Sequence, residues 1–439
     1  MATLKLSSSA NDFSFVIRKN PGSGMIAKNI RKGTAFGWYS APNTYCVAFF
    51  DGMDELSFAK QPGEEFAFLD RTRYNAPLFI SVAIREFFQT ALRKYDAEHD
   101  TTGGKHSIEV SSVEIGRKAI FEKIMPCFRK FHIELTSIPC QPEQMSQNAD
   151  NYVLKISTET GTIHELLNLG YLLGYLAAVC SKVEFQTEQG IITRLLEACN
   201  LLHAPYYVKY LLKARCIHSL DDFRKFETLL NASAENRLEF CPYTNTNARF
   251  HWIQNHIVRD MDILDFGCGE GRFFPLAQNI AFSTYYAADR DEKMRDAAQK
   301  SALRRELDNV TVLESWDAFR QLETGRDFVV IMSEVFEHNE LSDIRKILAE
   351  MLQNSHCVEI LLTTPNRNFN PFYFLPESEL RHPDHVFEMT QDEVKNCFEN
   401  LTHGTNFSCR FYELGDKVDG IPAIIGVTLA RNAKTKVKK

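Results

Sequence analysis

The sequence has little of several features that mark specialised proteins. It contains 21 glycines and 15 prolines among 439 residues, too few for a collagen-like or low-complexity chain. Basic residues are not in excess: the chain has 50 lysines and arginines and 57 acidic residues, and its formal net charge is −7. This balance argues against a protein that coats nucleic acid with a broadly basic surface, although a local basic groove is compatible with it.

Paired cysteines and long apolar runs are also missing. The eleven cysteines are scattered, without a CxxC pair or a zinc-type spacing, which predicts reduced thiols and a cytoplasmic protein. The N-terminal residues hold no continuous apolar segment after a charged start, so we expect no secretory signal. The most apolar stretch, 166–180, is shorter than the ~20 residues that cross a bilayer. It predicts a buried helix and no membrane association.

The apolar content that is present suits globular domains. Hydrophobic residues make up 44% of the chain, with 33 Phe and 15 Tyr, and the length predicts two or three domains at ~100–200 residues each. Short apolar runs between turn residues predict strands, apolar residues at helical spacing predict helices, and a polar stretch with two prolines predicts a linker. In the first half of the chain, these patterns predict strands at 13–17, 45–50 and 66–69 and helices over 78–94, 113–132 and most of 160–232. The predicted linker is at 137–151.

From residue 250 onwards, short apolar strands alternate with helical patterns. This alternation implies βαβ units and a doubly wound, mainly parallel sheet with helices on both faces. The expected strands are Asp262–Phe266, Thr284–Ala288, Val310–Leu313, Phe328–Met332 and Val358–Thr363. The predicted division is an α+β N-terminal domain at 1–150, a helical segment at 151–243, an α/β domain at 244–432 and a basic tail at 433–439.

A glycine-rich turn follows the first of these α/β strands, in the sequence ILDFGCGEG. The strand ends in Asp265, and Gly267, Gly269 and Gly271 alternate after it, which brings backbone close to a bound ligand. The pattern is not GxGxxG, and it suits a cofactor that carries a cation and no phosphate. A second acid, Asp289, ends the next strand, where it typically accepts both ribose hydroxyls of an adenosine.

This pairing of acids and glycines resembles class I S-adenosylmethionine-dependent methyltransferases. The resemblance implies a Rossmann-like methyltransferase domain and S-adenosyl-L-methionine as cofactor. Ser315 follows the third strand, where this fold contacts the adenine, although an ordinary loop serine fits equally well. Ser333, at the end of the fourth strand, is a further candidate for cofactor contact. Cys268 is interpreted as a small packing residue.

The fourth strand runs into Glu334, Glu337 and His338. If the chain is helical here, these side chains lie at i, i+3 and i+4 and share one face. They follow the carboxyl end of a strand, where ligands bind in this architecture, and so form a candidate half-site for a divalent metal. The alternative is an ordinary solvated helix face.

A later segment, LRHPDHVFEMT, supplies what could complete the site. His385 can act as a fourth ligand, with Arg381 and His382 beside it. The motifs EVFEH, TPN and RHPDHVFE occur in this order inside one methyltransferase-like domain. Together they resemble the Hen methyltransferase family, whose members are small-RNA 3′-terminal ribose 2′-O-methyltransferases.

The resemblance implies a specific chemistry. The metal ligands would be Glu334, Glu337, His338 and His385. The candidate catalytic residues are His338, His385, Arg381 and His382, and an imidazole among them could take the proton of the attacking 2′-hydroxyl. A shell of two carboxylates and two imidazoles favours Mn²⁺, Fe²⁺ or Co²⁺, with Mg²⁺ possible.

The resemblance extends into the first half of the chain. The segments 13–21 (FSFVIRKNP) and 74–92 are similar to the N-terminal half of the bacterial members. Those enzymes work in RNA repair with a polynucleotide kinase–phosphatase–ligase, so the expected partners are an RNA 3′ end and such a ligase. Two alternatives stay open: a class I methyltransferase that acts on a non-RNA acceptor, and a chain that serves mainly as a scaffold for the ligase.

Overall fold

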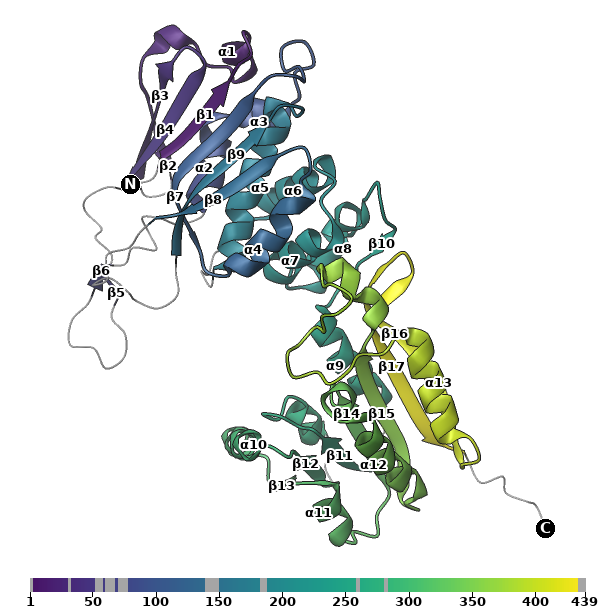
Figure 1. The fold of residues 1–439 in the computed structure, drawn as a ribbon. Helices are drawn as coiled ribbons and strands as arrows, with labels where there is room; N and C mark the ends of the chain where they lie inside the picture. Colours follow the sequence, from purple (N-terminus) through teal and green to yellow (C-terminus); the bar gives the residue numbers. More distant parts are fainter. Residues whose placement is uncertain are drawn as a thin grey trace. The chain divides into compact units, whose positions relative to one another are not determined.

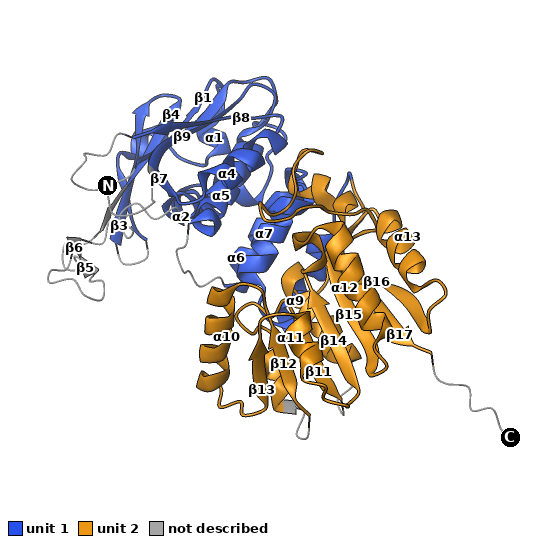
Figure 2. Cartoon of the chain, turned by 60° about the horizontal axis from the view of Figure 1, so that its bottom comes forward, with its two compact units in different colours: residues 1–235 blue, residues 236–439 orange. Residues whose placement is uncertain are grey.

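The chain, seen in a computed structural model, forms two compact units, Met1–Glu235 and Asn236–Lys439 (Figure 2). The structure describes residues 3–30, 33–51, 58–59, 68–69, 78–138, 150–181, 188–257, 261–279 and 283–432. The predicted basic tail and most of the predicted linker lie outside these residues.

The first unit is built on a seven-stranded sheet in which all neighbours are antiparallel (Figure 1). Its strands alternate buried and exposed side chains, as in β1, where Leu4 and Leu6 are buried and Lys5 is exposed. In spatial order the strands are β2 (Ile26–Ile30), β3 (Gly33–Ala41), β4 (Thr44–Asp51), β1 (Thr3–Ser8), β7 (His106–Ile115), β9 (Asp150–Thr158) and β8 (His132–Ser137). A separate pair joins β5 (Phe58–Ala59) to β6 (Phe68–Leu69).

The helices of the first unit include one that is almost wholly buried. This is α5 (Ile163–Cys180), which begins at a capping box of Thr162 and Glu165 and contacts α2 and β7. It is long and apolar enough to cross a membrane by length and composition, but 89% of it is buried inside the protein, so the predicted buried helix is confirmed. The other helices are α1 (Phe13–Val16), η1 (Pro21–Ser23), α2 (Leu78–Phe87), α3 (Gln89–Arg93), α4 (Lys118–Ile124), η3 (Met125–Cys127), α6 (Gln189–Leu201), α7 (Tyr206–Cys216) and α8 (Leu220–Asn231).

Two predictions for this unit are wrong. The run at 13–17 is the short helix α1 and not a strand, because Phe13 and Val16 are both buried at helical spacing. The helix predicted over 113–132 is reduced to α4 and a single 3-10 turn. Its first residues instead extend β7, whose pairing with β9 continues to Ile115, and its last residue begins β8.

The second unit is an eight-stranded mixed sheet with the five predicted strands at its centre and one edge. β11 (Asp262–Phe266), β12, β13, β14 and β15 are parallel, which confirms the mainly parallel α/β fold. Three antiparallel strands that were not predicted complete the sheet. The spatial order is β10 (Leu238–Glu239), β16 (Phe407–Val418), β17 (Ile421–Arg431), β15 (Cys357–Pro365), β14 (Phe328–Ser333), β11, β12 (Tyr285–Ala288) and β13 (Val310–Leu313).

Helices cover both faces of this sheet because successive strands are added first on one side of β11 and then on the other. From β11 the chain moves outward to β12 and β13, and it then returns to β14 and β15 on the other side of β11. Right-handed crossovers therefore place α10 on one face and α11 and α12 on the other. One hydrophobic core joins α11, α12 and α13 to the sheet. The helices are α9 (Asn245–His256), η5 (Phe274–Asn279), α10 (Glu292–Arg304), α11 (Trp316–Gln321), η6 (Phe336–His338), α12 (Leu341–Gln353), η7 (Arg367–Tyr373) and α13 (Gln391–Thr402).

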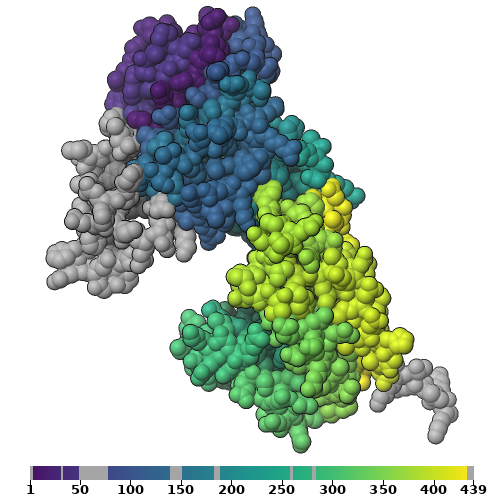
Figure 3. Space-filling model, viewed as in Figure 1, coloured from purple at the N-terminus to yellow at the C-terminus, as the bar shows by residue number. Residues whose placement is uncertain are grey.

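The reversal creates a topological switch point between β11 and β14. The carboxyl ends of these two strands flank a crevice, which is where ligands bind in open α/β sheets. The glycine-rich turn follows β11, and the segment from Glu334 to His338 follows β14. The space-filling view shows a hollow in the second unit between its teal-green and yellow-green parts (Figure 3).

Candidate active site

The glycine-rich turn has a backbone that only glycine adopts readily. Gly267, Gly269 and Gly271 have φ values of 80°, 52° and 83°. A Cβ on Gly267 would lie 2.3 Å from a methyl carbon of Val335, so this turn also packs closely on the segment after β14. Both the conformation and the contact explain the alternating glycines.

The two acids at the strand ends have different roles. Asp289 lines the pocket described below, and its two carboxylate oxygens accept the backbone N–H groups of Gly269 and Asp291, both at 2.9 Å. Asp265 is 1% exposed and accepts a hydrogen bond from the Tyr285 hydroxyl at 2.8 Å. Burial raises the pKa of Asp265 to about 7. Asp289 is therefore the acid that lines the pocket, whereas Asp265 is buried beside the turn.

A pocket of about 840 Å³ opens at the carboxyl ends of β11, β12 and β14. Ser315 lines it, and the hydroxyl of Ser315 also caps α11 by accepting the backbone N–H of Ala318. Ser333 does not line the pocket, and its hydroxyl is 3.0 Å from that of Thr363. The lining combines Gly267 and Asp289 with Trp316 and other side chains of α11 and α12. A nucleoside-bearing cofactor would fit a cavity of this size and lining.

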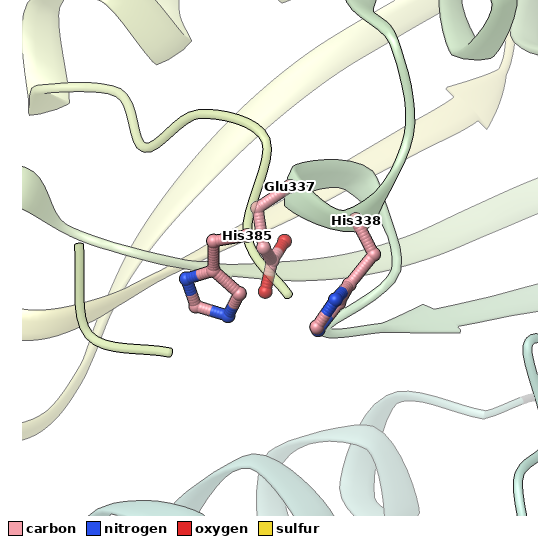
Figure 4. A group of neighbouring side chains, drawn as sticks. All are labelled: Glu337, His338 and His385. Atoms are coloured by element: carbon pink, nitrogen blue, oxygen red, sulfur yellow. The ribbon is translucent and has the colours of Figure 1, made fainter. Parts of the chain in front are cut away.

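Three of the four predicted metal ligands lie together beside this pocket. Glu337, His338 and His385 each offer one ligand atom, and these atoms lie within 4.8 Å of one another. Figure 4 shows the two imidazoles on either side of the Glu337 carboxylate. Glu337 and His338 come from η6, and His385 comes from the loop before α13. A backbone hydrogen bond of 2.8 Å from Val386 N to Glu337 O joins the two segments.

The Glu337 carboxylate is buried and only half satisfied. Its exposure is 0%; one oxygen accepts the Thr364 hydroxyl at 3.0 Å, and the other has no hydrogen-bond partner among the described residues. Burial, followed by the nearby Glu334 carboxylate, raises the pKa of Glu337 well above its ordinary value. A buried acceptor without a partner is costly, and a bound cation would remove that cost. The residues present therefore fit a divalent metal.

Both imidazoles are oriented by a hydrogen bond at Nδ1. His338 Nδ1 is 3.1 Å from the carbonyl oxygen of Asp384, and His385 Nδ1 is 2.6 Å from a carboxylate oxygen of Glu388. Since these partners are acceptors, Nδ1 donates in each ring and the lone pair is left on Nε2. Metal-binding histidines are commonly held in this way by a carbonyl or carboxylate. Burial and the neighbouring His385 lower the pKa of His338, which favours the neutral, metal-binding form.

Glu334 lies outside this group of three. It has a left-handed backbone with a φ of 57°, so it does not continue the η6 helical turn, and the expected arrangement at i, i+3 and i+4 does not form. One of its carboxylate oxygens forms an ion pair with Arg249 of α9, and the other is buried without a hydrogen-bond partner among the described residues. Glu334 still lines the pocket and raises the pKa of Glu337, so it is near the cluster.

Arg381 supports the loop that carries His385. Its guanidinium donates to the carbonyl oxygens of Ala423 (2.8 Å) and Asn366 and to the side-chain oxygen of Asn370 (2.6 Å). It also lies 5.2 Å from the ring centroid of Tyr373. These contacts join the loop to η7, to β17 and to the residue after β15, and in this way Arg381 positions the loop.

His382 is exposed at the edge of the cluster. The centroid of its ring is 6.0 Å from that of His338 and 5.7 Å from that of His385. It thus remains accessible to a substrate that approaches the two partly buried imidazoles.

Two supporting residues were not predicted as part of the site. Glu388 is 3% exposed and accepts hydrogen bonds from His385, from Arg381 N and from the Asn370 side chain. Thr364 holds Glu337. Glu388 follows His385 by three residues, and an acid at such a distance from a candidate ligand is a signal that could have found it. Thr364 begins the TPN motif, which was the signal for it, although its contact with Glu337 arises from the pairing of β14 with β15.

The fold, the glycine-rich turn and the acid at the end of β12 define the second unit as a class I methyltransferase domain of the S-adenosylmethionine-dependent type. A family model described as a methyltransferase domain matches residues 263–354. The Hen1 N-terminal domain model matches residues 3–235, more than half of the chain. The chain belongs to the Hen1 N-terminal domain family.

One curated protein and two solved structures are similar to part or nearly all of this chain. A small RNA 2′-O-methyltransferase of Caenorhabditis elegans is 32% identical over 73 residues, and this match spans 17% of the chain and 16% of that protein. A chain in the structure of a Pnkp1/Rnl/Hen1 RNA repair complex superposes with a TM-score of 0.77 at 22% identity, over 98% of this chain and 100% of that one. A chain of a second Pnkp1/Rnl/Hen1 complex gives 0.75 at 21% identity, with the same coverage. At these identities the superpositions establish a shared fold across both units.

Proposed function

We propose that this protein transfers a methyl group from S-adenosyl-L-methionine to the 2′-hydroxyl of the 3′-terminal ribose of RNA, with the help of a divalent metal. One observation carries the proposal: the buried Glu337 carboxylate has an oxygen without a hydrogen-bond partner among the described residues, and it lies beside two imidazoles that present Nε2. This cluster lies beside a methyltransferase cofactor pocket, and His338 contributes to both.

Glu337, His338 and His385 would hold the metal, and Glu334 is the candidate fourth ligand. This mixed set of oxygen and nitrogen donors favours Mn²⁺, Fe²⁺ or Co²⁺ over Mg²⁺. A bound ion would supply Lewis-acid activation of a ribose hydroxyl. Vicinal 2′- and 3′-hydroxyls occur together only at the 3′ end of an RNA, so a site that engages both would select that end and reject a 3′-phosphate.

The chain's own residues would position the reactants and handle the proton. The glycine-rich turn and Asp289 would hold the adenosine of the cofactor, so that its methyl group lies in line with the acceptor oxygen. Asp384 and Glu388 keep the two ligand imidazoles in place. His382 is exposed beside them and would take the proton of the 2′-hydroxyl.

A direct test uses purified protein, labelled S-adenosylmethionine, Mn²⁺ and a short RNA. Parallel reactions would use the same RNA ending in 2′-deoxy, 3′-deoxy or 3′-phosphate, and two variants, Glu337→Gln and the control Glu379→Gln. Glu379 is an exposed acid outside the cluster. We expect transfer to the unmodified RNA alone, lost in Glu337→Gln and retained in the control.

Two outcomes would contradict the proposal. Equal labelling of the 3′-phosphate RNA would exclude recognition of the free vicinal diol, and full activity of Glu337→Gln or in the presence of a chelator would exclude the metal. Transfer only to a non-RNA acceptor would instead support the alternative of a class I methyltransferase with another substrate.

We also propose that the chain works with an RNA-repair kinase–phosphatase–ligase. The superposition on a chain of the Pnkp1/Rnl/Hen1 complex over 98% of this chain supports this partner. Co-purification of the full chain with such a ligase would test it. If the Glu337→Gln variant stimulates the ligase as strongly as the wild type does, the chain has a scaffolding role that does not need the methyltransferase site.

A further inference from the structure

A basic hollow lies in the second unit outside the cofactor pocket. It has a volume of about 1190 Å³ and is formed by the end of the glycine-rich turn, by Arg272 and by residues in and just after α10. Five of its lining side chains are cationic and two are acidic, in a chain whose formal net charge is −7. The cations are Arg272, Lys293, Lys300, Arg304 and Arg305.

Three of these cations form a line along one face of α10. Lys293, Lys300 and Arg304 are spaced by seven and four residues, which returns them to the same side of a helix. At 1.5 Å per residue the line is ~16 Å long. Figure 2 shows α10 beside β13, at the edge of the sheet.

The stability of the helix does not account for this line. A cation in the last turn, such as Arg304, interacts favourably with the helix dipole, but Lys293 lies in the first turn, where a positive charge is unfavourable. Lys293, Lys300, Arg304 and Arg305 are exposed, and none of them forms an ion pair with another residue in the described part of the chain. Their charges are thus available to an anionic ligand.

Arg272 connects the hollow to the candidate active site. Its guanidinium donates to the side chain of Asn247 on α9 at 3.0 Å. The pKa of Arg272 is lowered, first by partial burial and then by the positive charge of Arg249, whereas the negative charge of Glu334 acts in the opposite direction. Arg249 is in turn paired with Glu334, which lines the cofactor pocket. Arg272, Arg249 and Glu334 therefore lie between the α10 cations and the Glu337 cluster.

We infer that the basic hollow, formed by Arg272 and the α10 cations Lys293, Lys300, Arg304 and Arg305, binds the phosphate backbone of the RNA upstream of its 3′-terminal nucleotide. This inference rests on the proposed function, because it takes the 3′ ribose to lie at the Glu337 cluster. Such contacts position a strand without reading its sequence. The hollow would then add affinity for longer RNAs while the cluster selects the free end.

The test compares two fluorescein-labelled RNAs with the same 3′ sequence, a trinucleotide and a strand several times longer. Dissociation constants would be measured by fluorescence polarisation over a range of salt concentrations. The proteins are the wild type, the double variant Lys300→Gln/Arg304→Gln and the control Arg345→Gln. Arg345 is exposed on α12, which covers the opposite face of the sheet from α10.

For the wild type we expect tighter binding of the longer RNA. In the double variant this advantage should shrink on the order of tenfold at 0.1 M salt, and the slope of log K against log salt should fall by about 1.4, because each lost phosphate contact on a single strand contributes about 0.7. The KM for methylation of the longer RNA should rise with the dissociation constant, and the control should behave as the wild type.

An unchanged length advantage in the double variant would overturn the inference, as would equal loss of affinity for the two RNAs. If the double variant keeps its RNA affinity but no longer binds a repair ligase, the hollow is a protein-docking surface and the inference is wrong. These outcomes are separable from failure of the proposed function, because methylation of the trinucleotide tests the active site and the length-dependent affinity tests the hollow. Absence of any RNA binding would contradict both.

Discussion

Replacing Glu388 by Gln tests how the buried carboxylate holds His385. One oxygen of Glu388 accepts both His385 Nδ1–H (2.6 Å) and Arg381 N–H (2.7 Å), and the other accepts the Asn370 side-chain N–H (2.6 Å). Gln offers only one acceptor oxygen, which the first two donors would claim. The Gln side-chain NH₂ would then face the NH₂ of Asn370. A flip of the Asn370 amide would not help, because its oxygen would then no longer accept the hydrogen bond from Arg381.

The expected cost follows from these contacts. Two buried donors that face each other cost about 1–3 kcal/mol of folding stability. Loss of the carboxylate behind a ligand imidazole typically weakens metal binding by about 10–100-fold, which corresponds to about 1.4–2.8 kcal/mol. Burial alone would raise the pKa of Glu388, but hydrogen bonds from His385, Asn370 and Arg381 hold this pKa below its usual value. Gln therefore replaces a group that is charged at neutral pH.

The assay is titration of the metal-free protein with Mn²⁺, followed by calorimetry or by the electron paramagnetic resonance signal of free Mn²⁺. Glu379→Gln is the matched control, and binding of S-adenosylhomocysteine reports whether the fold is intact. Weaker Mn²⁺ binding with normal S-adenosylhomocysteine binding is the expected result. An Mn²⁺ affinity equal to that of the wild type would refute the role assigned to the Glu388–His385 pair.

Three further predictions concern the residues around the pocket. Asp265→Asn should raise the melting temperature at pH 8 but not at pH 4. Because the pKa of Asp265 is raised to about 7, this carboxyl group binds its proton more tightly in the native state than in the unfolded chain. The wild type therefore loses stability as the pH rises from 3.8 towards about 7, and Asn avoids this loss. The gain should be on the order of a few kcal/mol in denaturant unfolding. Gly267→Ala should lower stability by at least about 1–3 kcal/mol and weaken S-adenosylhomocysteine binding in calorimetry, because its φ is 80° and its Cβ would meet Val335 at 2.3 Å. Arg249→Gln should lower the melting temperature of the metal-free protein but tighten Mn²⁺ binding, because it leaves the Glu334 carboxylate free to join the cluster; weaker Mn²⁺ binding would contradict this.

The α/β half of the fold could be predicted closely because most of its strands are short, mainly apolar runs that alternate with helical patterns. The strands at 262–266 and 310–313 have the bounds that the sequence predicted. The first half was harder. Antiparallel strands there are set by pairing between distant segments, so the boundary between β7 and α4 depends on β9, and a run such as 13–17 suits a helix as well as a strand.

The site could be predicted at the level of residue type and of the strand end that carries each residue. Glu337, His338 and His385 were identified from the sequence, and the structure brings them together. The position of Glu334 could not be predicted, because it depends on a left-handed backbone and on Arg249 from another element. Which hydrogen bonds orient each imidazole is likewise a property of the folded loop.

The loop that bears His385 is tied to the sheet by its own backbone and by Arg381. Val386 N binds Glu337 O, Arg367 N binds Met389 O at 2.9 Å, and Arg381 joins the loop to the carbonyl oxygens of Asn366 and Ala423. The entropy of ordering this segment is thus lost when the protein folds and not when a ligand arrives. An ion that bound the cluster could therefore leave and re-enter without exposing the loop to proteases, and one available metal could replace another while the loop stays folded.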